Sequence, residues 1–442
     1  MRTLFVSPSI PDPLDSGGSQ RMFHLLQGLA RVSDVTFVSG AHGGKHRNTE
    51  AAFRKLCSQT VFFPSESRAQ KRDAQLPRLL RWGKAVVRHI SSREPVLLQS
   101  FRSQEGAVLV EKLCQQPFDL IWVQRILPLN WLPAYVNARV VVDLDDLEHR
   151  KLLRELTINR PSKRTVFDYW EYVKLRRFEQ KHLPMQPWEF VVCSETDRRI
   201  LGGGPNIWVV PNGVKLVGCD EGACGATGDP IFTFVGLMEY APNVDAVQYF
   251  TREILPLIRR ELPTAKLFIV GKNPEAPVRR LHDGKTVIVT GTVPEVVPYL
   301  RQSSVSIVPL RIGGGTRIKI LEAMACRCPV VSTSIGAEGL EVKSSRHLLI
   351  ADTPLQFAEA CVKLHSDNGL RERIIGQAFE LVRTRYDWSM IERDVEKLVL
   401  AGPNRPTNYF GHIETQEGNG GKVARSEELI TEGTIGNHDH FV

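Results

Sequence analysis

The sequence lacks several features that would assign it to other protein classes. It contains no run of about 18 apolar residues, so we expect no transmembrane helix. Its first residues, MRTLFVSPSIPDP, include no long apolar stretch with a small-residue cleavage site, so a secretory signal peptide is not expected. No repeat of roughly 20–50 residues occurs, which excludes solenoid and propeller architectures.

Metal and dinucleotide motifs are also missing. The eight cysteines are scattered, and their spacings do not match a zinc site. No GxGxxG motif is present, which disfavours a bound dinucleotide. We therefore expect reduced thiols in a cytosolic protein.

What is present is enough apolar sequence for more than one hydrophobic core. The chain has 442 residues, of which 42% are hydrophobic, and this length predicts two or more domains. The net charge is +8, but Lys45 to Arg93 alone holds twelve Lys/Arg and three acidic residues. Such a patch favours an anionic partner such as a membrane surface or a phosphorylated substrate, and the alternative is a solvated basic face.

Short β-branched segments alternate with longer helical patterns through most of the chain. Brief apolar runs separated by helices are typical of parallel strands that are buried on both faces. They fall into two series, so the sequence predicts an α/β fold with two Rossmann-like domains. The predicted strands are 3–7, 35–39, 60–63, 119–123, 138–143, 190–194 and 207–211, then 231–236, 266–271, 286–291, 304–309, 329–333 and 347–351.

Composition sets the expected domain boundaries. The segment between Val214 and Asp229 is rich in glycine and small residues without periodicity, which is typical of a linker. A helical pattern runs over 372–400, and the seven glycines that follow favour disorder. The predicted parts are an N-terminal Rossmann-like domain (1–216), a C-terminal one (217–385), a C-terminal helix packing back toward the first domain (386–401) and a disordered tail (402–442).

One glycine-rich stretch, IGGGTRIKILEAMACRCPVVST, begins at Ile312. A helix over 316–327 would place Ile318 and Leu321 on an apolar stripe, with Glu322 at its border. Lys319 precedes Glu322 by three residues, so one interpretation is an ordinary helix ion pair of about 0.3 kcal/mol.

The position of this stretch suggests a second interpretation. It follows the predicted strand 304–309, and ligands of open α/β sheets bind at the carboxyl ends of strands. Glycine backbone amides and a helix N-terminus favour phosphate, and Arg317 and Lys319 add positive charge. The Glu322 carboxylate can accept two hydrogen bonds from a ribose diol. Together these residues predict a nucleoside diphosphate site.

The stretch from Gly315 to Thr333 resembles the donor-binding segment of retaining glycosyltransferases of family 4, which have the GT-B fold. The resemblance to this family spans about residues 1–400. Within the family, the sequence is most similar in kind to the sugar transferases of bacterial exopolysaccharide synthesis. Other segments that resemble the family are GGSQRMFHLLQGLA (17–30), VVPNGV (209–214), FVGLMEYAPNVDAVQYF (234–250) and VTGTVPEVVPYLRQSSVSIVPL (289–310).

The resemblance implies two Rossmann-like domains that face each other across a cleft, with acceptor bound by the first and nucleotide sugar by the second. It implies a retaining, metal-independent hexosyltransferase with a nucleotide-diphosphate sugar as co-substrate, no cofactor, a glycan or lipid-linked acceptor and no nucleic acid. The implied site residues are Asp145, Arg317 and Lys319 for catalysis, Gly236, Gly314, Gly315, Thr316, Glu322 and Glu338 for the donor, and Gly17 and Gly18 for acceptor or phosphate.

Several of these residues have structural alternatives. Asp145 lies in a group of aspartates that could cap a strand end. Glu338 could face solvent, and Gly17 and Gly18 could form a tight turn beside the first helix.

The sequence departs from the family at three places. The first of two family glutamates would fall at Gly314, so recognition of the donor sugar must differ here. The usual basic pair is replaced by Leu237 and Asn243, which leaves Arg317 and Lys319 to neutralise the diphosphate. Asp145 stands where relatives often have a histidine.

These departures keep two other functions open. One is a sugar-nucleotide epimerase of the same fold, and the other is a non-catalytic sugar-nucleotide-binding scaffold. Residues 78–93 form a further candidate element, since they carry five Lys/Arg, no acids and an apolar face at helical spacing. We expect a basic amphipathic helix that attaches the protein to the inner face of the cell membrane, or a helix packed over the first sheet.

Overall fold

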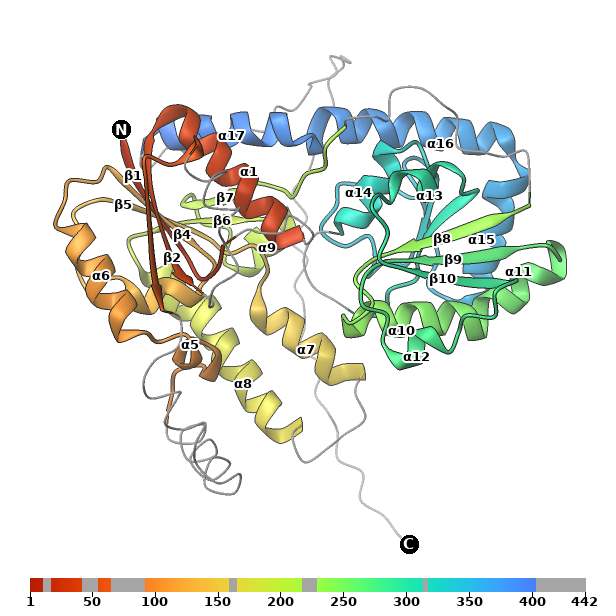
Figure 1. The fold of residues 1–442 in the computed structure, drawn as a ribbon, viewed down its shortest axis with the longest axis horizontal. Coiled ribbons are helices and arrows are strands. Elements are labelled where there is room, and N and C mark those ends of the chain that lie inside the picture. The colour runs from red at the N-terminus through yellow and green to blue at the C-terminus, as the bar shows by residue number, and fades with distance from the viewer. Residues whose placement is uncertain are drawn as a thin grey trace, which may run out of the picture. The chain divides into compact units, whose positions relative to one another are not determined.

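The structure, a computed structural model, describes residues 1–10, 17–41, 55–64, 92–158, 165–216, 229–312 and 317–402. Residues 1–405 form one compact unit. This unit contains two β-sheets whose paired strands are all parallel, and helices cover both faces of each sheet (Figure 1).

The first sheet has seven strands in the order β3-β2-β1-β4-β5-β6-β7. The middle of its central strands is apolar because both faces are buried there, as in β1, where Leu4, Phe5 and Val6 have no exposed surface. The strands are β1 Arg2–Ser7, β2 Asp34–Ala41, β3 Gln59–Pro64, β4 Leu120–Gln124, β5 Arg139–Asp143, β6 Glu189–Val192 and β7 Ile207–Val209.

The second sheet has six strands in the order β10-β9-β8-β11-β12-β13. Its core is continuous from Phe232 and Phe234 in the middle of the sheet to Phe357 and Ile374 in the helices behind it. The strands are β8 Ile231–Val235, β9 Lys266–Val270, β10 Val287–Gly291, β11 Val305–Val308, β12 Val330–Ser332 and β13 Leu349–Ile350.

Helices begin where side chains can cap their free amide groups. The hydroxyls of Ser194 and Thr353 and the carboxylate of Asp367 each accept a hydrogen bond from a first-turn amide. The helices are α1 Gly17–Val32, α5 Val96–Ser100, α6 Gln104–Cys114, α7 Glu148–Ile158, α8 Thr165–Arg177, α9 Glu195–Ile200, α10 Ala241–Tyr249, α11 Leu255–Glu261, α12 Ala276–Arg279, α13 Val297–Arg301, α14 Ile318–Ala325, α15 Pro354–Ser366, α16 Asn368–Leu381 and α17 Trp388–Leu400.

The chain returns to the first sheet through helix α17. Just before it, the Val214 amide donates to the Tyr386 carbonyl at 2.7 Å, and the Trp388 amide donates to the Val214 carbonyl at 3.2 Å. Helix α17 then lies against α1, so close that a Cβ added to Gly28 would be 2.9 Å from the Glu392 carbonyl oxygen (Figure 1). One helix from the C-terminal end therefore completes the layer over the first sheet.

The prediction of one unbroken helix over 372–400 is wrong at Asp387. Helix α16 ends at Leu381, a π-helical turn follows over Val382–Tyr386, and α17 starts at Trp388. Asp387 is extended (φ −70°, ψ 131°), and its carboxylate accepts a hydrogen bond from the Ser389 amide at 2.7 Å. This residue therefore caps a new helix and does not continue the old one.

Three predictions concern residues outside the described ones. They are the linker residues 217–228, residues 78–91 of the basic segment, and the tail from 403 to 442. Among the residues that the structure does describe, no helix has both the length and the apolar composition to cross a membrane.

Candidate functional site

A cavity of about 550 Å³ lies at the carboxyl ends of strands from both sheets. Arg125, Asp145 and Asn212 follow strands of the first sheet and line one side. Gly236 and Gly271 follow β8 and β9 of the second sheet and line the other. This is the edge at which open α/β sheets bind ligands.

Helix α14 begins at this cavity and is shorter than the predicted helix over 316–327. It runs from Ile318 to Ala325, and Arg317 occupies its N-cap position with φ −85° and ψ 83°. Ile318, Lys319 and Glu322 line the cavity and are only partly buried, whereas the apolar residues between and after them are packed against the second sheet and α16. The glycines and threonine before it, Gly314, Gly315 and Thr316, lie outside the described residues.

Two cations from this segment line the cavity, Arg317 and the partly buried Lys319. Arg317 is 7% exposed, and burial lowers the pKa of its guanidinium. The Lys319 ammonium donates to the Asn243 side-chain oxygen at 2.7 Å and lies 4.1 Å from the centre of the Phe234 ring. Burial, with Arg317 nearby, lowers the pKa of Lys319 to about 7. Desolvated cations in an open cavity are stabilised by an anionic ligand.

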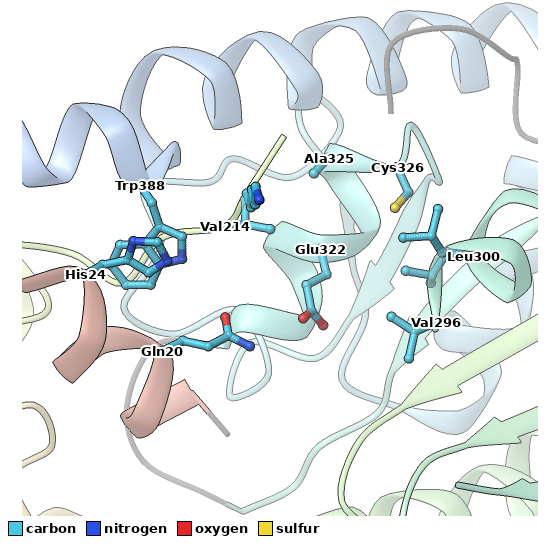
Figure 2. A pocket seen from close by; sticks show the side chains of 11 residues that line it. Gln20, His24, Val214, Val296, Leu300, Glu322, Ala325, Cys326 and Trp388 are labelled. Carbon is cyan, nitrogen blue, oxygen red and sulfur yellow. The ribbon is translucent and has the colours of Figure 1, made fainter. Parts of the chain in front are cut away.

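The interpretation of Lys319 and Glu322 as an ordinary ion pair does not describe the structure. No ion pair joins these two described side chains, and the Lys319 ammonium instead donates to Asn243. The charge of Lys319 still acts on Glu322 and partly offsets the effect of burial on the pKa of that carboxyl. Glu322 lies between the large cavity and an adjoining one of about 290 Å³. Figure 2 shows its carboxylate and the amide of Gln20 extending into the same space, beside the stacked rings of His24 and Trp388. Burial raises the pKa of Glu322.

A fully buried arginine fixes α1 at the cavity. The Arg21 guanidinium donates to both oxygens of Asp143 at 2.6 and 2.9 Å, and to the side-chain oxygen of Asn212 at 3.1 Å. Burial opposes the charge of Arg21, but Asp143 outweighs that effect and raises its pKa. A buried bidentate pair of this kind holds the two elements in one geometry.

Asp145 lies directly beyond this pair in an unusual backbone conformation. Its φ is +56°, in the left-handed region that costs a non-glycine residue roughly 1 kcal/mol or more. Its carboxylate is 3.8 Å from Arg21 and 3.7 Å from the Cys193 sulfur, and a Cβ added to Gly18 would lie 3.5 Å from it. The structure therefore places Asp145 at the cavity wall beside the first turn of α1.

Three predicted glycines allow close approach at the cavity. A Cβ on Gly17 would lie 2.8 Å from the Ile318 side chain, and one on Gly236 would lie 3.0 Å from the Lys319 nitrogen. Gly17 and Gly18 are the first residues of α1 and do not form a separate turn. The absence of side chains here brings the starts of α1 and α14 together.

Sequence analysis missed several residues of this cavity. Asp146 follows Asp145 and lines the wall, and burial and the neighbouring Asp145 raise its pKa to about 7. Arg125, Lys151 and Tyr240 also line it. No sequence motif marks Arg125 or Lys151 as cavity residues. Asp146 could have been predicted only from its position next to Asp145.

Glu338 does not line the cavity. Its carboxylate accepts hydrogen bonds from the guanidinium groups of Arg150 and Arg154 on α7. Burial alone would raise its pKa, but Arg154 and Arg150 outweigh this and lower it. The other described candidates, namely Gly17, Gly18, Asp145, Gly236, Arg317, Lys319 and Glu322, line the same cavity. The described part of the chain holds no cluster of three potential metal ligands.

Comparison with known proteins identifies the C-terminal part of the chain. Residues 229–367 match the family model described as glycosyl transferases group 1. An uncharacterized 44.6 kDa protein in the cps region of Klebsiella pneumoniae is 26% identical over 162 residues, or 35% of this chain and 42% of that protein. A phosphatidyl-myo-inositol mannosyltransferase of Mycobacterium leprae is 28% identical over 152 residues, or 33% and 40% of the two chains. Each match spans less than half of the relative's length.

Solved structures resemble the whole two-sheet arrangement. Sucrose-phosphate synthase from Thermosynechococcus elongatus superposes with a TM-score of 0.60 at 15% identity, covering 91% of this chain and 99% of that one. HepE from Anabaena in complex with UDP gives a TM-score of 0.57 at 13% identity, covering 91% and 100%. At such identities the similarity shows the fold alone, and it confirms the predicted α/β GT-B fold. Residues 229–367 thus match the group 1 glycosyl transferase model, within a chain that has the GT-B fold.

Proposed function

We propose that this protein is a glycosyltransferase that moves a sugar from a nucleotide-diphosphate donor to a glycan or lipid-linked acceptor. One observation supports this most directly. The buried Arg317, the partly buried Lys319 and the carboxylate Glu322 line one cavity at the ligand-binding edge of the second sheet. Two positive charges and a diol acceptor about one helical turn apart fit the diphosphate and ribose of a nucleotide.

Lys319 compensates for a basic pair that this sequence lacks. Asn243 occupies one position of the usual basic pair, and the Lys319 ammonium is hydrogen-bonded to the Asn243 side chain. A lysine on α14 therefore delivers its charge beside the place where the family supplies one from α10. The Anabaena HepE structure contains UDP, which supports a nucleotide in a cavity of this fold.

The proposed mechanism is electrostatic and retains the anomeric configuration. When the glycosidic bond to phosphate breaks, negative charge develops on the leaving diphosphate, where Arg317 and Lys319 stabilise it. On the same face of the sugar, the acceptor oxygen bonds to the anomeric carbon that the diphosphate leaves, and a phosphate oxygen takes the proton of the acceptor hydroxyl. This chemistry assigns no step to a metal or cofactor. Asp145 and Asp146 would face the sugar and the acceptor from the first sheet.

The acceptor belongs to a cell-surface polysaccharide or a lipid-linked intermediate in this proposal. The Klebsiella relative is named for the cps region, and the mycobacterial relative is named as a mannosyltransferase of a phosphatidylinositol. We further propose that the protein works in the cytosol and that the basic segment 78–93 holds it at the inner membrane face. Replacing Arg78, Arg81, Lys84 and Arg88 with Gln should then reduce sedimentation with anionic liposomes. Unchanged recovery would refute this attachment.

The test of the proposed function is release of free nucleotide diphosphate. A thermal-shift panel of nucleotide diphosphates and their sugars first identifies the donor, because a ligand of the native state raises the melting temperature. Release that requires an acceptor supports the transferase. Turnover of the sugar nucleotide without acceptor would indicate the epimerase, and binding without any turnover would indicate the scaffold.

The variant Arg317→Ala tests whether this cavity is where the transfer reaction takes place. We expect turnover to fall more than donor affinity, because charge on the leaving group is greatest in the transition state. Arg373→Ala is the matched control, since Arg373 is exposed on α16. Equal turnover of the two variants would remove Arg317 from the reaction.

A further inference from the structure

Helix α8 has apolar side chains on two opposite sides. Tyr172 and Leu175 are buried against the rest of the first half of the chain. Val166, Tyr169 and Trp170 on the other side are 62%, 57% and 58% exposed. A helix that is apolar all round is normally buried all round, whereas these three side chains of α8 are each more than half exposed.

The exposed side chains form one continuous stripe. Val166, Tyr169, Trp170 and Val173 follow the spacing i, i+3, i+4 and i+7, which at about 100° per residue places them within about 60° of one direction. No other described helix contributes more than one large hydrophobic side chain to the exposed surface. Single exposed apolar residues are ordinary on protein surfaces, whereas a stripe of four marks an interaction surface.

Charge along the same face selects the kind of partner. The next positions of the stripe are Arg176 and Arg177, which are both exposed. The acids of α8 point elsewhere, because Glu171 accepts hydrogen bonds from the amides of Val96 and Leu97 at 3.0 and 2.9 Å. Asp168 is placed about 160° from the centre of the stripe by the same helical geometry. The face is therefore apolar and aromatic at one end and cationic at the other.

We propose that this face of α8 (Val166, Tyr169, Trp170, Val173, Arg176 and Arg177) docks on a bilayer surface that contains anionic lipid. Tyr and Trp prefer the interface between water and acyl chains, because one part of the ring is apolar and the other part is polar. Arginines beside them pair with lipid phosphates. A protein partner would need acids opposite the arginines and an apolar groove, whereas an anionic bilayer supplies both features at once. This surface shares no residue with the segment 78–93 and does not depend on the proposed catalysis.

Sedimentation of the full chain with vesicles tests the proposal. One set of vesicles contains phosphatidylglycerol and phosphatidylcholine in equal parts, and the other contains phosphatidylcholine alone. We expect Trp170→Glu to reduce the partition coefficient onto the anionic vesicles by about tenfold or more, since an interfacial aromatic side chain is lost. Leu355→Glu on α15 is the matched control, because Leu355 is 59% exposed but, among the described residues of α15, has no second exposed large hydrophobic side chain beside it.

Removing the cations separates their role from that of the apolar stripe. Arg176→Gln with Arg177→Gln should weaken binding about fivefold per charge on anionic vesicles and leave binding to neutral vesicles unchanged. Both residues are exposed, so the variant should melt at the temperature of the unmodified chain.

Four outcomes would overturn the proposal. They are absence of vesicle binding by the full chain, equal binding of Trp170→Glu and Leu355→Glu, dependence of binding on the cations of residues 78–93 alone, and a dimer in solution that Trp170→Glu dissolves without any vesicle binding. The last outcome would assign the stripe to a second copy of the chain.

Discussion

At the scale of single residues, Lys319 is a buried amine in a cavity that we propose binds an anion. Burial lowers its pKa from 10.5 to about 7, so this amine loses its proton at a lower pH than an exposed lysine does. An unfolded lysine binds a proton up to about pH 10.4, so between these two values the unfolded state holds more protons. The Lys319 contribution to stability therefore rises with pH across this window.

The same shift predicts that nucleotide binding takes up a proton. A diphosphate next to Lys319 favours the ammonium form, so affinity should fall by up to about tenfold per pH unit above 7. Calorimetry at pH 8 in buffers with different ionisation enthalpies measures the uptake. Lys319→Arg, which stays charged, should abolish it. Asp146→Asn is the matched control, because the pKa of this carboxyl is also raised to about 7. Uptake that persists in Lys319→Arg but vanishes in Asp146→Asn would assign the proton to Asp146.

A second residue-scale prediction concerns Glu322. Loss of charge-assisted hydrogen bonds to a ribose diol should weaken binding of a nucleoside diphosphate by about 10- to 100-fold in Glu322→Gln. A dideoxynucleotide should bind the unmodified protein as weakly as the natural nucleotide binds the variant. The variant itself should not distinguish the two nucleotides. Glu372→Gln, exposed on α16, is the control. A variant that still prefers the natural ribose would place the diol elsewhere.

The residues predicted from sequence came from one contiguous stretch or from motif resemblance. Arg317, Lys319 and Glu322 are close in sequence, so one helix and one loop were enough to group them. Tyr240 and Lys151 reach the same cavity from elements almost 90 residues apart, and no local pattern encodes such a contact. The hydrogen bond between Lys319 and Asn243 spans 76 positions and could not be predicted either. The missing basic pair indicated only that Arg317 and Lys319 would have to supply positive charge.

At the scale of elements, the strand ends at the cavity depend on the contact of two glycines. A Cβ on Gly271 would lie 1.7 Å from the Gly236 carbonyl oxygen, which is far inside van der Waals contact. Gly271 follows β9 and Gly236 follows β8, so this contact sets the distance between the two strand ends. The repeated strand and helix pattern predicted both strands. It could not predict that the residues at these strand ends must lack side chains, because that requirement arises from tertiary packing.

Gly271→Ala should therefore separate β8 from β9 at the cavity. We expect loss of nucleotide binding and a destabilisation of about 1–3 kcal/mol, as for other overpacked sites. Thermal melting with and without nucleotide diphosphate measures both effects. Gly376→Ala is the matched control: nothing lies within 4 Å of its added Cβ on α16, and it should stabilise the helix by about 0.5–1 kcal/mol. Equal melting temperatures for the two variants would contradict the packing argument.

At the scale of the whole molecule, the halves of the sequence are not the packing units of the structure. Trp388, Ile391, Val395, Leu398 and Val399 of α17 belong to the same core as Phe5, Leu25 and Leu29 of the first sheet and α1. The His24 ring stacks on Trp388 at 4.4 Å, and Glu392 accepts hydrogen bonds from His24 and Arg31. The sequence predicted a helix at this position, and its apolar stripe required a partner, but only the resemblance to a family indicated which half it joins.

Truncation after Tyr386 should therefore unfold the first half of the chain and spare the second. The five buried apolar side chains of α17 contribute about 2 kcal/mol each, or about 10 kcal/mol together, which is as large as the whole stability of a typical domain. None of these five side chains belongs to the core of the second sheet, so the truncation leaves that core unchanged. Circular dichroism of chains ending at Gly402 and at Tyr386 measures the effect: the shorter chain should keep one cooperative melting transition and lose the helical signal of the first half. Val395→Asp in the longer chain should give the same loss, whereas Lys397→Asp, on the exposed side of α17, should not. A shorter chain that melts like the longer one would show that the first sheet folds with α1 alone.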